Sequence, residues 1–244
     1  MIGYEREEKK MADPERWGLF SEQAEAMPDD LRQHWEDFQA CFSTKMRDPS
    51  EQAYAYLRGM QTMEKDRHFA GISRTVQGAD GQALQHFLSQ LPWSGQVVFT
   101  QIQEEIRERA DLAVGSYLLL DENEDEKAGS ASAGTSRQYN GRQGKVDECQ
   151  VEVVMDYVNW QSGHWTTWSW VDGDLFLPAE WFTDAFAVRR KTVGIPEGLK
   201  FQTKLQMGVA MIRRANVKNE SECLQTAGLP FEGVACDELY GRDE

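Results

Sequence analysis

The sequence feature that most constrains the fold is a change in hydrophobic spacing at Leu112. Before it, apolar residues recur three and four positions apart, as in Leu31, Trp35 and Phe38, which places them on one face of a helix. After it, apolar residues alternate with polar ones or form short continuous runs, as they do in strands. The chain therefore predicts a helical part followed by a sheet, within the α+β or mixed α/β class.

Three domains follow from this change. Residues 1–28 are charged and show no clear period, so we expect a loose arm. Residues 29–111 form the predicted helical domain, and residues 112–244 form the predicted sheet domain. A hydrophobic content of 40% in a chain of 244 residues is ample for a packed core.

The sheet domain has a predictable strand order. The run Val114–Leu120 predicts a buried central strand that ends at Asp121, and a polar, Gly-rich loop over residues 122–144 follows it. The alternation in QVEVVMDYV and the segment HWTTWSWV predict two more strands in an antiparallel meander. A crossover helix that begins at Thr203 and a short fourth strand that ends at Asp237 complete the sheet. The fourth strand can lie parallel beside the first.

Two carboxylates end neighbouring strands in this arrangement. Adjacent strands lie about 4.8 Å apart, so Asp121 and Asp237 would sit side by side. Carboxylates held that close repel each other unless a divalent cation lies between them, and Mg²⁺ or Mn²⁺ suits such oxygen ligands. Two such ions are the apparatus for displacement at phosphorus, which predicts phosphodiester cleavage or transfer. An aspartate at a strand end is more often a turn or helix-cap residue, so spacing alone leaves both interpretations open.

The charge of the chain supports two opposite interpretations of a nucleic-acid partner. A net charge of −15 argues against a nucleic-acid partner, because phosphate binding is led by Lys and Arg. The basic residues nevertheless cluster, and Arg137, Arg142 and Lys145 flank the strand next to the acids. We take these three as candidate contacts to DNA phosphates, together with Lys204 in the crossover helix. Ordinary solvent-exposed charges are the equally open alternative.

Three tryptophans in one predicted strand admit two roles. Trp165, Trp168 and Trp170 could stack on bases or sugars. Packing in the core or on the sheet is the favoured interpretation, because large aromatic side chains dominate core packing.

Several classes of protein are excluded by the absence of their signals. No apolar run approaches the roughly 20 residues of a bilayer span, and the N-terminus lacks a signal peptide. We therefore expect a cytoplasmic protein with no membrane partner and no small-molecule substrate. The four cysteines form no CxxC pair, which argues against a zinc site, and three of them sit inside apolar segments, which predicts reduced, buried thiols.

Five segments of the chain carry a resemblance to a known family. They are LLLDENEDEKAG, SRQYNGRQGKVDECQV, LFLPAEW, IPEGLKFQTKLQMGVAMIRRA and FEGVACDELYG. In order and spacing they resemble the catalytic region of insertion-sequence DDE transposases, which have a ribonuclease H-like fold, and the resemblance runs from about Asp80 to the end.

This resemblance implies a site and its partners. Asp121 and Asp237 would be the first and second catalytic aspartates, holding Mg²⁺ or Mn²⁺, and the partner would be double-stranded DNA at transposon ends. The preceding helices, including QALQHFLSQLPW, would bind that DNA or hold a homodimer. The location would be the nucleoid of a prokaryotic cytoplasm.

The sequence departs from the family pattern at the third carboxylate, which is a glutamate in the family. It lies on a helix beyond a further strand, whereas Glu244 follows Asp237 by only seven residues. The sequence therefore predicts an incomplete ribonuclease H-like sheet and a truncated, inactive transposase fragment. The alternative is a non-catalytic DNA-binding or dimerising protein that modulates a full-length transposase.

Overall fold

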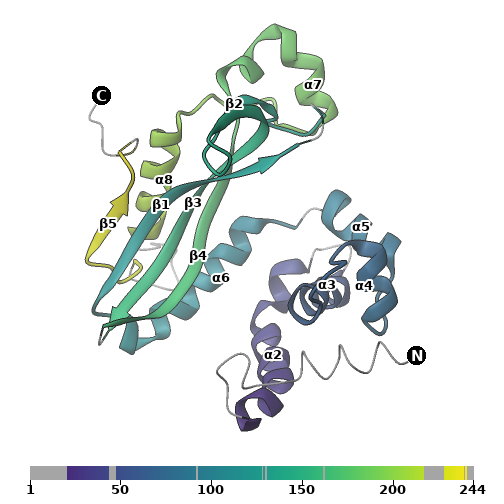
Figure 1. Cartoon of the computed structure of the whole chain (residues 1–244), viewed down its shortest axis with the longest axis vertical. Helices are drawn as coiled ribbons and strands as arrows, with labels where there is room; N and C mark the ends of the chain where they lie inside the picture. Colours follow the sequence, from purple (N-terminus) through teal and green to yellow (C-terminus); the bar gives the residue numbers. More distant parts are fainter. Residues whose placement is uncertain are drawn as a thin grey trace. The chain divides into compact units, whose positions relative to one another are not determined.

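The computed structural model describes residues 21–43, 48–91, 93–127, 129, 131–161, 163–216, 228–238 and 240. The chain divides into two compact units, Met1–Gln101 and Ile102–Glu244, which are described separately (Figure 1). The division falls inside helix α6 (Gly95–Glu108), ten residues before the predicted change at 111, because Ile102 and Ile106 pack into the core of the sheet unit. Of the predicted arm, residues 1–20 lie outside the described residues and residues 21–28 belong to helix α2.

The first unit consists of short helices around two small cores. Its helices are α2 (Ser21–Phe42), α3 (Ser50–Thr62), α4 (Phe69–Thr75), α5 (Gly81–Gln90) and the start of α6. One core joins Met63, Ile72, Val76 and Leu84 from α4, α5 and the connecting segments. In the other, the rings of Trp35, Phe42, Phe87 and Trp93 contact one another. Helix α4 was not predicted, because seven residues are too few to show a helical period.

The second unit is built on a mixed five-stranded sheet. Its strands are β1 (Ser116–Glu126), β2 (Ser136–Asn140), β3 (Lys145–Gln161), β4 (His164–Phe176) and β5 (Gly233–Cys236). Strand β3 pairs antiparallel with β1, β2 and β4, and β5 pairs parallel with β1. Two 3₁₀ turns (Ala179–Phe182 and Asp184–Phe186), α7 (Ala187–Thr192) and α8 (Lys204–Asn216) connect β4 to β5. This mixed sheet fits the expected ribonuclease H-like fold.

Two expectations for the sheet were wrong. Strand β1 does not end at Asp121 but continues to Glu126, because Glu124 stays buried and pairs with Val151 of β3. Strand β2 occupies part of the predicted loop over residues 122–144. The period of two persists through these polar residues, and hydrophobicity alone does not reveal it.

Helix α8 covers one face of the sheet (Figure 1). It begins with a reciprocal capping pair. The backbone N–H of Gln206 donates to Thr203 Oγ1 at 3.2 Å, and the backbone N–H of Thr203 donates to Gln206 Oε1 at 2.9 Å. Its buried side packs with Leu118 and Leu120 of β1. A Cβ on Gly208 would stand 3.2 Å from Leu120, so the helix lies close against the sheet.

Cys41, Cys149 and Cys236, the cysteines that the structure describes, form no disulfide, and they are not all buried. Cys149 is buried, Cys41 is half-buried and Cys236 is exposed, because β5 lies at the edge of the sheet. Cys223 lies outside the described residues. No helix in the described ranges combines the length and the apolar composition that crossing a membrane requires.

Candidate active site

Asp121 and Asp237 lie at the same level of neighbouring strands. Strand β1 buries Leu118 and Leu120 against α8, so the alternation of a strand exposes Asp121 on the opposite face. Strand β5 pairs with β1 in parallel, and the last pair of residues in this register is Leu120 of β1 and Cys236 of β5. The next residue on each strand is one of the two aspartates, and both are exposed. The structure thus brings together two acids that stand 116 positions apart in the sequence.

A third acid, Asp156, lies on the same face of the sheet as Asp121. Asp121 pairs with Val154 on β3, and Asp156 is two residues farther along that strand. Asp156 is 7% exposed, and its Oδ1 has no hydrogen-bond partner among the described residues. Burial raises the pKa of Asp156, and the charge of Asp121 raises it further, while a hydrogen bond from Trp168 acts against the rise. Sequence reasoning missed Asp156, because it looked like one of the outward polar residues of an alternating strand.

The opposite face beside Asp121 holds Glu122, Lys204 and Tyr240. Lys204 Nζ forms an ion pair with Glu122 Oε2. The other carboxylate oxygen of Glu122 and the hydroxyl of Tyr240 are buried with no hydrogen-bond partner in the described ranges. Burial raises the pKa of Tyr240, and the charges of Glu122, Asp237 and Asp121 raise it further. Lys204 was predicted to contact DNA, and in the structure its ammonium already neutralises an acid beside Asp121.

The donor set at this edge fits a hard divalent cation. Asp121 and Asp237 offer carboxylate oxygens from adjacent strands. In addition to burial, the charge of Asp121 raises the pKa of Asp156, and the charges of both aspartates raise the pKa of Tyr240. A cation between them would relieve this repulsion. Among the described residues, no third Asp, Glu, His or Cys joins both aspartates in a group whose ligand atoms lie within 4.8 Å of one another. The described side chains therefore offer such a site at most these two acids.

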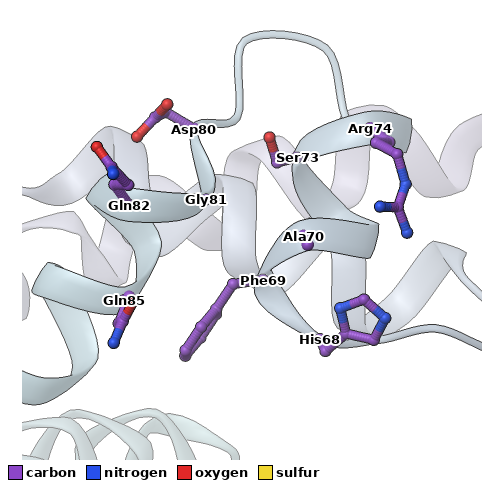
Figure 2. A pocket seen from close by; sticks show the side chains of 9 residues that line it. All are labelled: His68, Phe69, Ala70, Ser73, Arg74, Asp80, Gly81, Gln82 and Gln85. Atoms are coloured by element: carbon purple, nitrogen blue, oxygen red, sulfur yellow. The ribbon is translucent and has the colours of Figure 1, made fainter.

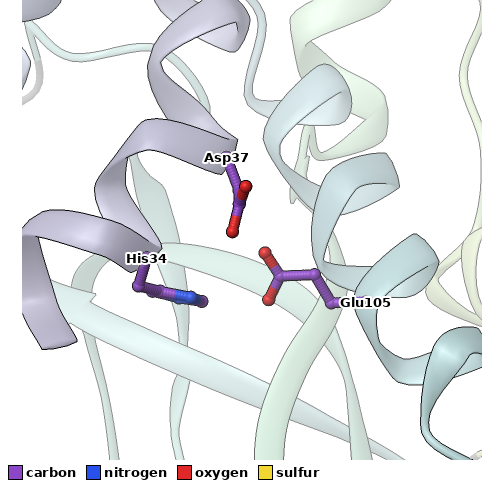
Figure 3. A group of neighbouring side chains, drawn as sticks. All are labelled: His34, Asp37 and Glu105. Atoms are coloured by element: carbon purple, nitrogen blue, oxygen red, sulfur yellow. The ribbon is translucent and has the colours of Figure 1, made fainter.

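Three other potential ligands do not make a second site within either unit. His34 and Asp37 lie three residues apart on α2, and Glu105 lies on α6 (Figure 3). Glu105 belongs to the sheet unit and the other two belong to the helical unit. Neither unit taken alone supplies three ligands from this set.

The predicted phosphate contacts gather on the β2–β3 hairpin. Arg137, Arg142 and Lys145 are exposed there. Lys145 Nζ lies 2.7 Å from Asp147 Oδ2, and this hydrogen-bonded ion pair raises the pKa of Lys145. Lys145 stands nine residues along β3 from Val154, the partner of Asp121, which is roughly 30 Å at about 3.3 Å per residue. The basic hairpin is thus remote from the acids and does not line their immediate surroundings.

The tryptophans of β4 are not core residues where they are described. Trp168 is 65% exposed and Trp170 is 49% exposed. They pair with Val158 and Asp156, which places them on the face that carries Asp121. The prediction of core packing is therefore wrong for these two, whereas packing on the sheet stays a prediction. The side chain of Trp165 lies outside the described residues.

Comparisons with known proteins show the family to which the chain belongs. The family model of the DDE superfamily endonucleases matches residues 37–244. The probable transposase for insertion sequence element IS701 of Microchaete diplosiphon is 26% identical over 193 residues, which cover 79% of this chain and 43% of the relative. The chain thus spans less than half the length of that relative, and no solved structure gives a significant match. Because the family model covers most of its length, the chain belongs to the DDE superfamily endonucleases.

Proposed function

We propose that the chain is the part of a DNA transposase that cleaves and joins the ends of an insertion sequence. The reaction is phosphodiester hydrolysis followed by strand transfer at a 3′-hydroxyl. The observation that carries the proposal is the placement of Asp121 and Asp237 side by side on β1 and β5, in a chain of the DDE superfamily. The relative from Microchaete diplosiphon, a probable transposase, supports the same assignment.

The two aspartates act as ligands in this proposal. Endonucleases of this superfamily use divalent metal ions, and we assign Mg²⁺ or Mn²⁺ to Asp121 and Asp237. When bound, such ions supply activation of the attacking oxygen and stabilisation of the leaving oxygen. The ion pair between Lys204 and Glu122 holds α8 against β1 next to Asp121. We assign Lys204 and Glu122 a positioning role beside Asp121.

The proposed partner is double-stranded DNA at transposon ends. The exposed hairpin residues Arg137, Arg142 and Lys145 would contact phosphates about 20–30 Å from the acids, which corresponds to roughly six to nine base pairs. We assign the helical unit to DNA binding or to a homodimer. Such a protein would act at the nucleoid of a prokaryotic cell.

A nicking assay tests the proposal. Labelled duplexes taken from the DNA on both sides of the coding sequence are incubated with the chain and Mn²⁺. Nicking, which would overturn the inactive fragment expected from the sequence, is the outcome that this proposal predicts, and Asp121→Asn or Asp237→Asn should reduce it at least about 100-fold, equivalent to about 2.7 kcal/mol. Asp125→Asn is the matched control, since Asp125 is an exposed acid on the same strand and should leave nicking unchanged. Equal nicking by the control and the Asp121 variant would contradict the assignment.

A second candidate function is favoured by one observation. The described residues supply no third ligand to the acid pair. A non-catalytic protein that binds DNA, or that dimerises with a full-length transposase and modulates it, needs no complete metal site. This candidate predicts retention of the flanking duplex without nicking in any metal, together with inhibition of a full-length relative when the two are mixed.

A further inference from the structure

A hollow of about 640 Å³ lies between α4 and α5 of the helical unit. Figure 2 shows His68 and Asp80 in its lining, one at the start of each helix. Each of them accepts a backbone N–H of its own helix, at 3.1 Å and 2.7 Å, and is thus engaged as a cap. In the sheet unit, by contrast, polar atoms of Glu122 and Tyr240 are buried beside the acid pair without a hydrogen-bond partner among the described residues.

The pairing of β5 with β1 ends one residue before Asp237. The last pair in register is Leu120 and Cys236, and the last three residues of β5 are exposed. Burial therefore contributes little to holding the end of this four-residue strand. After Cys236, the first buried residue that the structure describes is Tyr240, which is 8% exposed. The position of Asp237 is thus set between the last backbone pair and this buried ring.

The ring of Tyr240 lies over Gly208 of α8. A Cβ added to Gly208 would stand 3.2 Å from Leu120 and from two ring carbons of Tyr240, which is closer than ordinary van der Waals contact. Glycine inside a helix is unfavourable relative to alanine, and the space that the ring occupies accounts for a glycine here. Tyr240 and Leu120 also share one buried core with Met207 of α8. The ring therefore ties the segment after β5 to both α8 and β1.

The hydroxyl of Tyr240 lies among carboxylates. Burial raises the pKa of Tyr240, and the charges of three acids raise it further, in the order Glu122, Asp237 and Asp121. The phenol therefore keeps its proton and can donate a hydrogen bond to a carboxylate. Glu122 directly follows Asp121 on β1, and its Oε1 is buried. Tyr240 thus links the residue next to one acid with the turn that follows the other.

We infer that Tyr240 is a positioning residue for the acid pair. Its ring, seated on Gly208, fixes the turn after β5, so that Asp237 stands beside Asp121 at the spacing that a divalent cation needs. The hydroxyl adds a donor toward Glu122. This inference rests on the proposed function, in which the acid pair holds Mg²⁺ or Mn²⁺, and it names the side chain that sets the distance between the two ligands. Residues that orient metal ligands typically change metal affinity by about 10–100-fold.

Manganese binding by the whole chain tests the inference without a nicking assay. Electron paramagnetic resonance follows the signal of free Mn²⁺ and gives the Kd. Tyr240→Ala should weaken binding about tenfold or more, whereas Tyr240→Phe keeps the ring and should recover the affinity to within about threefold of the native chain. Gly208→Ala, which displaces the ring, should weaken binding about threefold. Gly198→Ala is the matched control, because a Cβ there meets nothing within 4 Å.

Two further measurements separate positioning from a general loss of stability. If Tyr240 acts through Asp237, Tyr240→Ala should cause no further loss of Mn²⁺ affinity in an Asp237→Asn background. Leu112→Ala removes a buried side chain of the same core before β1, and it should lower the unfolding temperature with unchanged Mn²⁺ affinity. Hydrogen exchange in EDTA gives a readout without metal, in which Tyr240→Ala should speed exchange in β5 and leave β3 protected.

The outcomes distinguish this inference from the proposed function. Unchanged Mn²⁺ affinity in Tyr240→Ala, beside a loss in Asp121→Asn, overturns the inference and leaves the metal assignment intact. Failure of Tyr240→Phe to recover the affinity also overturns it. Native affinity in Gly208→Ala does the same, and this variant decides the matter if Tyr240→Ala does not fold. If Asp121→Asn leaves Mn²⁺ binding unchanged, the metal assignment fails. Hydrogen exchange then decides the inference, since faster exchange in β5 supports it and unchanged exchange overturns it.

Discussion

The helical unit and the sheet unit differ in where they carry acidic residues. From Gly81 to Gln103, across α5 and the start of α6, the sequence contains no acid. From Asp121 to Glu126, five of six residues on β1 are acidic. The first stretch also contains no Lys or Arg, so it neither attracts nor repels DNA phosphates strongly, whereas the second offers the oxygen ligands that a divalent cation binds. Charge is thus unevenly distributed along the chain, and the net charge of −15 does not by itself exclude a nucleic-acid partner.

The sheet unit also holds a buried acid, Asp172, whose charge is neutralised by a partner, in contrast to the exposed pair Asp121 and Asp237. Asp172 is fully buried, and the guanidinium of Arg214 on α8 lies 2.8 Å from its Oδ2. Arg214→Ala leaves a buried carboxylate without its partner, which should cost about 3 kcal/mol, a low value for a buried pair because Arg214 is 38% exposed. Chemical denaturation measures the loss.

The control for this change is Asp174, the other partner of Arg214. The Asp174 side chain is 51% exposed, so Asp174→Ala should cost under about 1 kcal/mol. If both variants lost the same stability, burial of Asp172 would not set the importance of the pair.

Gly71→Ala should lower the stability of the helical unit and leave that of the sheet unit unchanged. A Cβ on Gly71 would meet the carbonyl oxygen of Asp66 at 1.9 Å, so Gly71→Ala must displace the backbone before α4. We expect a loss of about 1–3 kcal/mol confined to the helical unit. Hydrogen exchange should show faster exchange in α3–α5 and unchanged protection in β1 and β3. Gly95→Ala, where a Cβ meets nothing within 4 Å, should leave both units unaffected.

The cap of α5 offers a smaller effect on stability and a test of its charge. Asp80→Ala removes the acceptor for the Ala83 N–H and should cost about 1 kcal/mol. Asp80→Asn keeps an acceptor and should preserve stability while it tightens binding to any duplex, because a negative charge is lost from the helical unit that we assign to DNA binding. Thermal unfolding measures the stability, and fluorescence anisotropy measures the affinity for a duplex. Weaker binding by the stable Asn variant would speak against DNA binding by the helical unit near Asp80.

The smallest expected effect is a difference in reactivity between the thiols of Cys149 and Cys236. Burial raises the pKa of Cys149, and the charge of Glu124 raises it further, so less thiolate forms at a given pH. Alkylation of the native chain at pH 8, followed by peptide mass spectrometry, should modify exposed Cys236 well before Cys149. Because Cys236 adjoins Asp237, Mn²⁺ should slow its modification and leave that of Cys149 unchanged. Rapid modification of Cys149 would show that β3 opens easily.

The sequence predicted the parts of the fold that hydrophobic pattern controls. The spacing of three and four predicted the helical domain and the face of α2 that carries Leu31, Trp35 and Phe38. Apolar runs located the start of β1 and the strand before Asp237. Helix α8 was predicted from Thr203 and its apolar face. The second half of β1 and all of β2 were missed, since their polar side chains are held by pairing with β3 and show little hydrophobic signal.

Sequence reasoning reached the acid pair but not its surroundings. Asp121 and Asp237 were predictable, because both follow short apolar runs. Asp156 and Tyr240 were not, because their relation to Asp121 depends on strand register and on the path of the chain after β5. Their raised pKa values arise from burial and from the neighbouring acids, neither of which a single sequence displays.

The central claim is that Asp121 and Asp237 together hold a divalent cation. Anomalous diffraction from crystals of the whole chain grown with Mn²⁺ tests it most directly. The account predicts a manganese peak between the two carboxylates, within about 2.0–2.3 Å of oxygens from both, and its loss in Asp121→Asn. Manganese bound only at other acids, or an unchanged peak in the Asp121→Asn crystal, would contradict it.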